Sequence, residues 1–137
     1  MSLDEEELIG VWSAGAGYYD TFSDEFLIFN PDGTGRMEGW VLQLDSVDFF
    51  EWKVVAPGLI DLIGDRHVGR RGPNGESMIE ILSDFHFRGI PFNVAEKVRP
   101  PGTGQWMLVL EIGLPVPWPS ELGLVTRNGS EWERGAD

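Results

Sequence analysis

The chain has 137 residues, which is enough for one domain with its own core and too few for two. Its net charge of −13 argues against nucleic acid and against an anionic membrane surface as partners. Because the chain has no cysteine, disulfides, thiolate nucleophiles and thiolate metal sites are excluded.

The charge is concentrated in the first half of the chain. Residues 1–65 carry 14 acidic side chains against Arg36 and Lys53, a balance of −12, whereas residues 66–137 carry 9 acidic and 8 basic ones, a balance of −1. Such a surface keeps a protein in solution and can steer a basic partner. The first residues are acidic, unlike a secretory signal, and no apolar run approaches the roughly 20 residues that span a bilayer. We therefore expect a soluble cytoplasmic protein that does not bind a membrane.

The first half of the chain predicts one helical turn followed by four short strands. Residues 4–8 are acidic and suit a helix N-terminus, where negative side chains are favourable. The segment Phe26–Trp40 contains a Pro-Asp-Gly-Thr-Gly turn between two apolar runs, which predicts a hairpin. The expected strands cover residues 8–12, 22–30, 35–44 and 48–55.

The second half continues in the same way, with a polar interruption. Residues 65–76 form the most polar stretch and are expected to be a loop. Prolines at 115, 117 and 119 predict a rigid surface connection that exposes Trp118 for contact with a partner. Residues 129–137 are expected to fray. The expected strands cover residues 59–64, 79–88, 94–99, 105–112 and 122–127.

These short, regularly spaced strands predict an all-β fold with a single domain over residues 1–137. The 18 glycines and 9 prolines suit many turns, and no long helical pattern interrupts the strands. We expect a single antiparallel up-and-down barrel of about 8–9 strands. A two-sheet β-sandwich is the alternative, because it also needs one apolar face per strand.

Gly10-Val11-Trp12, on the first expected strand after a short acidic turn, resembles the Gly-X-Trp element of lipocalins and the wider calycin group. That resemblance implies an up-and-down barrel that holds a small apolar ligand. It also implies barrel closure by Trp12 and Arg127, with an arginine from the last strand covering the tryptophan. The chain lacks the Arg-X-Tyr triplet with which fatty-acid-binding relatives hold a carboxylate, which argues against a fatty acid.

Large aromatic side chains supply the candidate ligand site. Those expected to point inward either fill the barrel as a core or line an apolar pocket. As a pocket they would contact an apolar ligand. The predicted ligand-binding residues are Trp40, Phe50, Trp52, Phe87 and Trp106.

A basic group in the expected loop, Arg66, Arg70 and Arg71 together with His67, is a candidate anion site. The alternative is that these side chains are solvated or paired with neighbouring acids. We expect no metal site, because His67 and His86 lack ligand spacing and the Asn30–Gly35 segment has no glutamate where a calcium loop needs one. No Gly-X-Ser-X-Gly element or marked carboxylate pair predicts catalytic residues, and no cofactor is expected.

Two functions from different classes follow from these patterns. The first is a non-enzymatic lipocalin-like protein that binds a small apolar ligand in the barrel. The second is an acidic interaction protein, of the immunity type, that neutralises a basic protein partner.

Overall fold

The computed structural model describes residues 5–15, 23–41, 43–71, 77–82, 85–99, 106–115 and 118–127. Within these ranges, residues 23, 41, 43, 44, 70, 71, 77 and 78 are described by their backbone only. The tail expected to fray, residues 129–137, lies outside the described residues.

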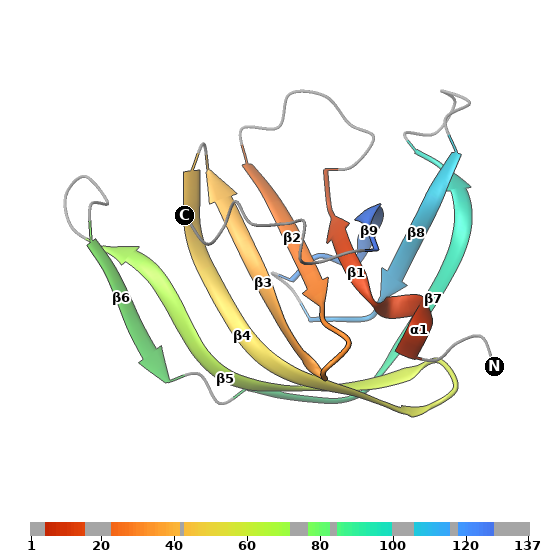
Figure 1. Cartoon of the computed structure of the whole chain (residues 1–137), viewed down its shortest axis with the longest axis horizontal. Helices are drawn as coiled ribbons and strands as arrows, with labels where there is room; N and C mark the ends of the chain where they lie inside the picture. The colour runs from red at the N-terminus through yellow and green to blue at the C-terminus, as the bar shows by residue number, and fades with distance from the viewer. Residues whose placement is uncertain are drawn as a thin grey trace.

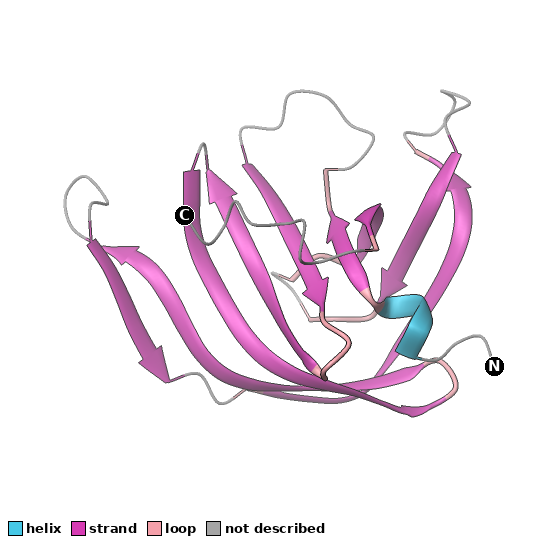
Figure 2. Cartoon of the chain, viewed as in Figure 1, coloured by secondary structure: helices cyan, strands magenta, loops and turns pink. Residues whose placement is uncertain are grey.

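The described part of the chain forms one short helix and nine strands. Figure 1 shows their arrangement, and Figure 2 shows how small the helical part is. No helix in this part of the chain is long and apolar enough to cross a membrane. The elements are α1 (Glu5–Leu8), β1 (Gly10–Ser13), β2 (Ser23–Phe29), β3 (Thr34–Val41), β4 (Gln43–Ala56), β5 (Leu59–Arg71), β6 (Ser77–Leu82), β7 (His86–Val98), β8 (Trp106–Ile112) and β9 (Glu121–Thr126).

The strands form one closed antiparallel barrel, which confirms the predicted fold class. Neighbouring strands follow the order β4-β3-β2-β1-β9-β8-β7-β5-β6, and β4 also pairs with β5. That last pairing joins eight strands into a ring and leaves β6 as an extra strand beside β5. Because the sheet closes on itself, the two-sheet sandwich is wrong.

β6 and β7 run in the same direction along one edge of β5, β6 beside its upper part and β7 beneath (Figure 1). Along β5 the partner strand changes from β7 to β6: Ile63 is opposite His86 of β7, and Arg66 is opposite Leu82 of β6. The strand expected at residues 79–88 is therefore wrong as one element, because it covers the end of β6 and the start of β7.

The loop expected at residues 65–76 is also wrong in its first part. Residues 65–71 belong to β5, and all of them except Asp65 pair with β4 or β6. Opposite Phe49 and Phe50 lie Arg66 and Gly64, so Asp65 is skipped as a β-bulge. The bulge shifts the alternation of facing side chains by one residue, which made this polar stretch look irregular in the sequence.

The turn between β2 and β3 has the chemistry predicted for it. Asp32 Oδ1 accepts hydrogen bonds from the Thr34 hydroxyl at 2.6 Å and the Thr34 amide at 2.9 Å. These bonds hold the pKa of Asp32 below its ordinary value, the hydroxyl contributing most. Gly33 has φ of 88°, a conformation that glycine adopts without strain. The turn explains the residues that resembled a calcium loop.

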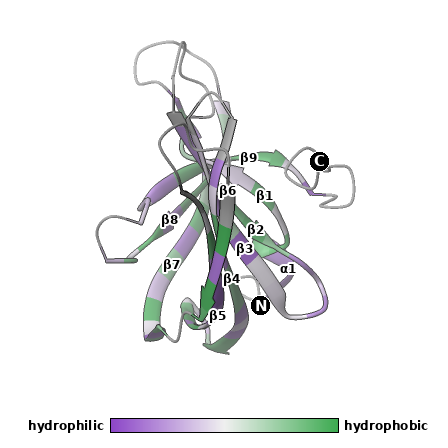
Figure 3. Ribbon diagram, turned by 90° about the vertical axis from the view of Figure 1, so that its left-hand side faces the viewer, coloured by the Kyte–Doolittle hydropathy of each residue, from purple (hydrophilic) through white to green (hydrophobic). Residues whose placement is uncertain are grey.

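Alternating side chains build the core, as the successive green and purple segments along the strands in Figure 3 indicate. In β2 and β3 the inward positions carry odd numbers, and in β8 they carry even ones. The buried inward residues form one cluster: Leu8, Trp12, Leu27, Phe29, Met37, Phe50, Trp52, Ile60, Leu62, Phe92, Leu110, Ile112, Leu114 and Leu122.

Trp118 contributes to this core, so the prediction that it is an exposed contact residue is wrong. Its amide donates to the Pro115 carbonyl at 2.9 Å, which folds the β8–β9 connection back toward the barrel. Its ring lies 5.1 Å from Phe85, 5.4 Å from Phe87 and 6.3 Å from Phe50, measured between ring centroids. Trp118 thus fills part of the interior with its edge-on aromatic contacts.

Candidate functional site

The up-and-down order gives the barrel two ends with different contents. α1 and the β2–β3 and β4–β5 connections lie at one end, here called the proximal end. The C-terminal ends of β1, β3 and β5 lie at the other, here called the distal end. The end of β7 lies there too, because Arg99 Nη2 donates to the Ala14 carbonyl at 2.6 Å. Each predicted site residue can be placed relative to these ends.

Trp12 and Arg127 meet at the proximal end. Trp12 is fully buried, and its Nε1 donates to the Leu8 carbonyl at 2.8 Å. The Arg127 guanidinium carbon lies 5.6 Å from the Trp12 ring centroid. Its Nη1 also donates to the carbonyls of Glu7 at 2.6 Å and Ile9 at 3.0 Å. Arg127 therefore covers the tryptophan and binds the carbonyls that end α1.

We expect Arg127→Met to lower the free energy of unfolding by about 1–3 kcal/mol. Methionine keeps an apolar stem over Trp12 but cannot donate to the three carbonyls. Urea denaturation followed by tryptophan fluorescence measures the change. Arg88→Met, on an exposed position of β7, is the matched control. Equal losses in the two variants would show that Arg127 adds nothing beyond its charge.

Three of the predicted ligand-binding residues lie within the packed core. Phe50 and Trp52 are 2% and 7% exposed, and the Phe29 ring contacts both at 5.9 and 5.3 Å. The half-buried Phe87 packs against the same cluster. These rings fill the interior of the barrel around β4 and β7.

Trp40 points away from the interior, so its predicted inward position is wrong. It is opposite Asp24, and its neighbour on the same face, Glu38, is opposite Phe26. Its Nε1 donates to Glu38 Oε1 at 2.9 Å, and its ring lies edge-on to Phe26 at 6.5 Å. The odd positions of β3, including Met37, are the ones that face inward, and Trp40 has the opposite parity.

Trp106 is 66% exposed, so the prediction that it packs inside the barrel is also wrong. It has the inward parity of Leu108 and Leu110, both of which pack in the core. However, it is the first residue of β8 and pairs with Val98 at the end of the β7–β8 ladder, beyond the packed layers. The alternation of residues along a strand indicates which face each side chain is on. It does not indicate where along the strand the packed core ends.

The candidate anion residues belong to β5 rather than to a loop. The Arg66 guanidinium carbon lies 4.1 Å from the centre of the Phe49 ring, a cation–π contact on the outer face. The side chains of Arg70 and Arg71 lie outside the described residues, so an anion site there stays a prediction.

At the distal end, residues on the face of the sheet that lines the barrel form two layers, which cross the ring strands β2 to β5 and continue onto the extra strand β6. Because directly opposed residues share a face, the register identifies them. The inner layer contains Leu27, Met37, Asp48, His67 and Ile81. The outer layer contains Glu25, Gly39, Ser46, Gly69 and Ile79.

The inner layer holds an aspartate–histidine pair. His67 Nδ1 lies 2.7 Å from Asp48 Oδ1, and both side chains are half-buried. Because an ionised carboxylate only accepts, Nδ1 carries the proton and Nε2 of a neutral ring is an acceptor. A side chain at Gly69 would place its Cβ 3.0 Å from that Nε2. Glycine therefore leaves the free edge of the imidazole uncovered on this side.

The outer layer holds a half-buried carboxylate, Glu25. Burial raises its pKa above the ordinary value, and the neighbouring charge of Asp24 adds to the shift. Asp24 accepts from the Ser13 hydroxyl at 2.8 Å and the Gly15 amide at 2.9 Å. Within the described part of the chain, the Glu25 carboxylate has no hydrogen bond or ion pair.

We expect Glu25→Gln to stabilise the protein at about pH 7 and to have no effect at about pH 3.5. A carboxyl whose pKa is raised in the folded state loses stability as pH rises through the interval between its unfolded and folded pKa values. Glutamine removes that loss. Urea denaturation at both pH values measures it, with Glu51→Gln on the exposed outer face of β4 as control. A variant less stable at about pH 7 would contradict the expectation.

Sequence reasoning missed Glu25 and assigned His67 to a loop. The signal for Glu25 was its spacing of two and four from Leu27 and Phe29, which face inward. It was obscured because Phe26 to Phe29 are all apolar and show no alternation. The bulge at Asp65 obscured the facing of His67 in the same way.

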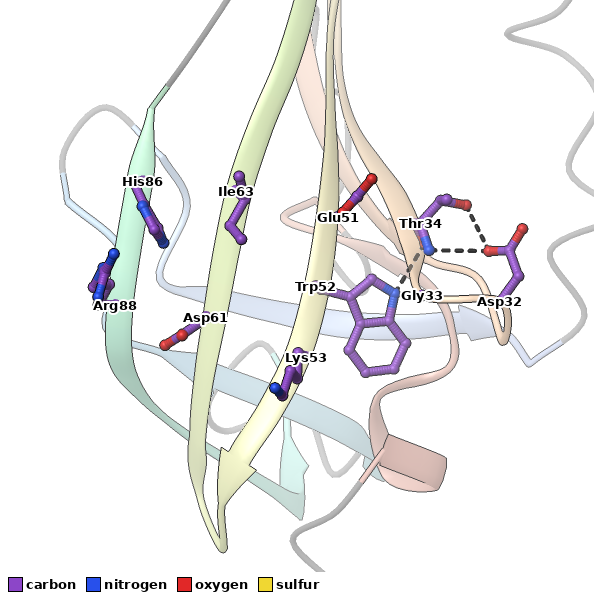
Figure 4. A pocket seen from close by; sticks show the side chains of 10 residues that line it. All are labelled: Asp32, Gly33, Thr34, Glu51, Trp52, Lys53, Asp61, Ile63, His86 and Arg88. Atoms are coloured by element: carbon purple, nitrogen blue, oxygen red, sulfur yellow. Dashed lines mark hydrogen bonds between the residues drawn. The ribbon is translucent and has the colours of Figure 1, made fainter.

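A groove of about 600 Å³ lies on the outside of the barrel, between the β2–β3 turn and strands β4, β5 and β7 (Figure 4). Its charges are nearly balanced, with Lys53 and Arg88 against three carboxylates. Asp61 accepts from the Gly89 amide at 2.7 Å, and Asp32 is bound within its own turn. The lining residues are Asp32, Gly33, Thr34, Glu51, Trp52, Lys53, Asp61, Ile63, His86 and Arg88.

The groove offers little to an apolar molecule. Trp52 and Ile63 are its large apolar residues, and the Trp52 Nε1 already donates to the carbonyls of Thr34 at 2.9 Å and Asn30 at 3.2 Å. Among the described residues, no group of three or more histidines and carboxylates could hold a metal ion. The distal layers are therefore the better candidate site for an apolar ligand.

Comparisons with known proteins found no relative of this chain. No protein-family model matches the chain, and neither a curated protein nor a solved structure matches it.

Proposed function

We propose that this protein is a non-enzymatic, lipocalin-like binding protein that holds a small apolar molecule at the distal end of its barrel. The observation that carries the proposal is the exposure of two isoleucines on β6, on the face that continues the barrel lining beyond β5. Ile79 and Ile81 are 44% and 49% exposed, whereas Leu27 and Met37, in the same layer as Ile81, are buried. Apolar surface left uncovered beside the mouth of a small barrel is typical of a ligand site.

The neighbouring residues support this site. Gly39, Ser46 and Gly69 are small, so three adjacent strands present little side-chain volume in the outer layer. Phe50 and Trp118 lie one step deeper and give the site an aromatic base. An apolar ligand would thus contact the isoleucines at one side and the packed rings beneath it.

The lipocalin-like character rests on two further observations. The Gly10-Val11-Trp12 element begins β1, after α1, and Arg127 lies over Trp12 at the end opposite to the proposed site. Eight antiparallel strands in up-and-down order complete the likeness. In such barrels one end is packed and ligands enter at the other.

Titration calorimetry with 1-naphthalenemethanol tests the proposal, since that probe is small and mainly apolar. We expect saturable binding by the native protein and at least about tenfold weaker binding by the Ile79→Asn, Ile81→Asn double variant. Leu82→Asn is the matched control, because Leu82 is on the opposite face of β6 and 87% exposed. No binding by the native protein, or equal losses in both variants, would refute the site.

A basic protein partner and a cytoplasmic location stay predictions from the charge and composition of the chain.

A further inference from the structure

We infer that the apolar ligand of the distal end carries a hydroxyl group, and that this hydroxyl donates a hydrogen bond to Nε2 of His67. The inference rests on the proposed function, because it concerns the same site. It adds the polar contact by which the site distinguishes one apolar molecule from another of similar size. His67 is then a specificity-determining residue.

The free edge of the His67 ring lies beside the isoleucines of the proposed site. His67 is directly opposite Ile81, and Gly69 is directly opposite Ile79. Nε2 lies 3.0 Å from the position that a Cβ at Gly69 would take, so the nitrogen lies over Gly69 on the face that lines the barrel. Neighbouring strands of a sheet lie about 4.8 Å apart. One bicyclic aromatic molecule can therefore contact β6 and reach Nε2 on β5 at the same time.

The pairing with Asp48 makes Nε2 a hydrogen-bond acceptor. Nδ1 of His67 lies 2.7 Å from Asp48 Oδ1, and an ionised carboxylate only accepts, so the proton of a neutral ring is on Nδ1. The side chains of Asp48 and His67 are 18% and 30% exposed, so water reaches the pair from one side. Within the described residues, no group donates to Nε2. This nitrogen is an oriented acceptor whose donor comes from solvent or from a ligand.

The surroundings of Nε2 favour an uncharged donor. Ile79 and Ile81 present apolar surface, and a charged group would lose its water there at a large cost. An anionic group would also be repelled by Asp48, which is bonded to the same ring. Ethers, esters and ketones only accept, so they would displace water from Nε2 and leave it without a donor. An alcohol or a phenol provides an uncharged donor on a small apolar body.

Two probes that differ in one donor test the inference: 1-naphthalenemethanol and its methyl ether, 1-(methoxymethyl)naphthalene. Titration calorimetry at about pH 8, where a histidine ring is ordinarily neutral, gives for each protein the dissociation constant of the ether divided by that of the alcohol. We expect this ratio to be about fivefold higher in the native protein than in His67→Phe, since one hydrogen bond is lost. The ether should still bind His67→Phe saturably, which shows that the variant keeps the site.

His86→Phe is the matched control, because it replaces the same side chain at an exposed position of β7 on the outer groove. It should keep the native ratio.

A second measurement needs no change at His67. In a nitrogen NMR spectrum of the histidine side chains, His67 should show a protonated Nδ1. Its Nε2 resonance should move when the alcohol is added and stay in place with the ether. Because the chain has two histidines, the spectrum of His86→Phe assigns the remaining signals to His67.

An equal ratio in the native protein and in His67→Phe would overturn the inference and leave the proposed function intact. A loss of the same size in His86→Phe would do so too. A proton on Nε2 in the free protein would also overturn it, because that nitrogen would then donate. Failure of both probes to bind the native protein would instead refute the proposed function.

Discussion

Replacing Trp12 with alanine is expected to lower the free energy of unfolding by about 4 kcal/mol, the upper part of the range for large aromatic residues in cores. Trp12 is completely buried, so its removal leaves a cavity at the proximal end. The variant also loses the hydrogen bond from Nε1 to Leu8 and the ring on which Arg127 lies. The loss of three contacts at one residue makes this the largest effect we expect.

Guanidinium denaturation followed by circular dichroism measures the change. Trp106→Ala is the matched control, because it removes the same side chain from a position that is 66% exposed, and its effect should stay below about 1 kcal/mol. Trp12→Phe keeps a ring but loses the bond to Leu8, so it should fall between the two. Similar losses for Trp12→Ala and Trp106→Ala would contradict the assigned core.

Gly35→Ala is expected to lower the free energy of unfolding by about 2–3 kcal/mol through overpacking. A Cβ at this position would lie 2.5 Å from the Ile28 carbonyl oxygen and 2.5 Å from the ring of Phe50. Neither neighbour can move freely, because the carbonyl belongs to the β2–β3 ladder and the ring is packed in the core. The strands at the end of the hairpin would have to separate.

Gly39→Ala, in the same strand and on the same face, is the control. Among the described residues, the Cβ there would meet only the Ser46 hydroxyl within 4 Å, at 2.8 Å, and that group can rotate away. Its effect should stay within about 1 kcal/mol. Thermal unfolding of both variants compares them directly, and a cost for Gly39→Ala equal to that of Gly35→Ala would show that steric conflict is not the cause.

The architecture was accessible from the sequence because local signals agreed with it. The Asp32-Gly33 turn determined one hairpin and its register, and apolar alternation predicted most strands. The resemblance around Trp12 predicted that Arg127 covers this ring, and the Arg127 guanidinium carbon lies 5.6 Å from the ring centroid. Each of these signals depends on residues close in sequence or on a pattern with a fixed period.

The candidate site was less accessible, since it depends on where each strand changes face or reaches a rim. Trp40 was assigned inward as a large aromatic residue, but it lies on the outward face of β3. Trp106 was assigned inward by alternation, but it lies at the end of its strand, beyond the packed core. Glu25 lies next to a run of four apolar residues that conceals its facing. Pairing between strands that are distant in sequence decides where these three side chains lie. A single sequence does not reveal that pairing.

The skipped residue at Asp65 makes β5 a strand with two alternation frames. Before it, even-numbered residues such as Leu62 face inward, and after it His67 and Gly69 do. One further residue inserted beside Asp65, without a larger bulge, would turn Arg66 inward opposite Asp48 and send His67 outward. The chemistry of the distal end could therefore change from an aspartate–histidine pair to an aspartate–arginine pair with no substitution at all. Chain length at this position determines the lining as firmly as residue identity does.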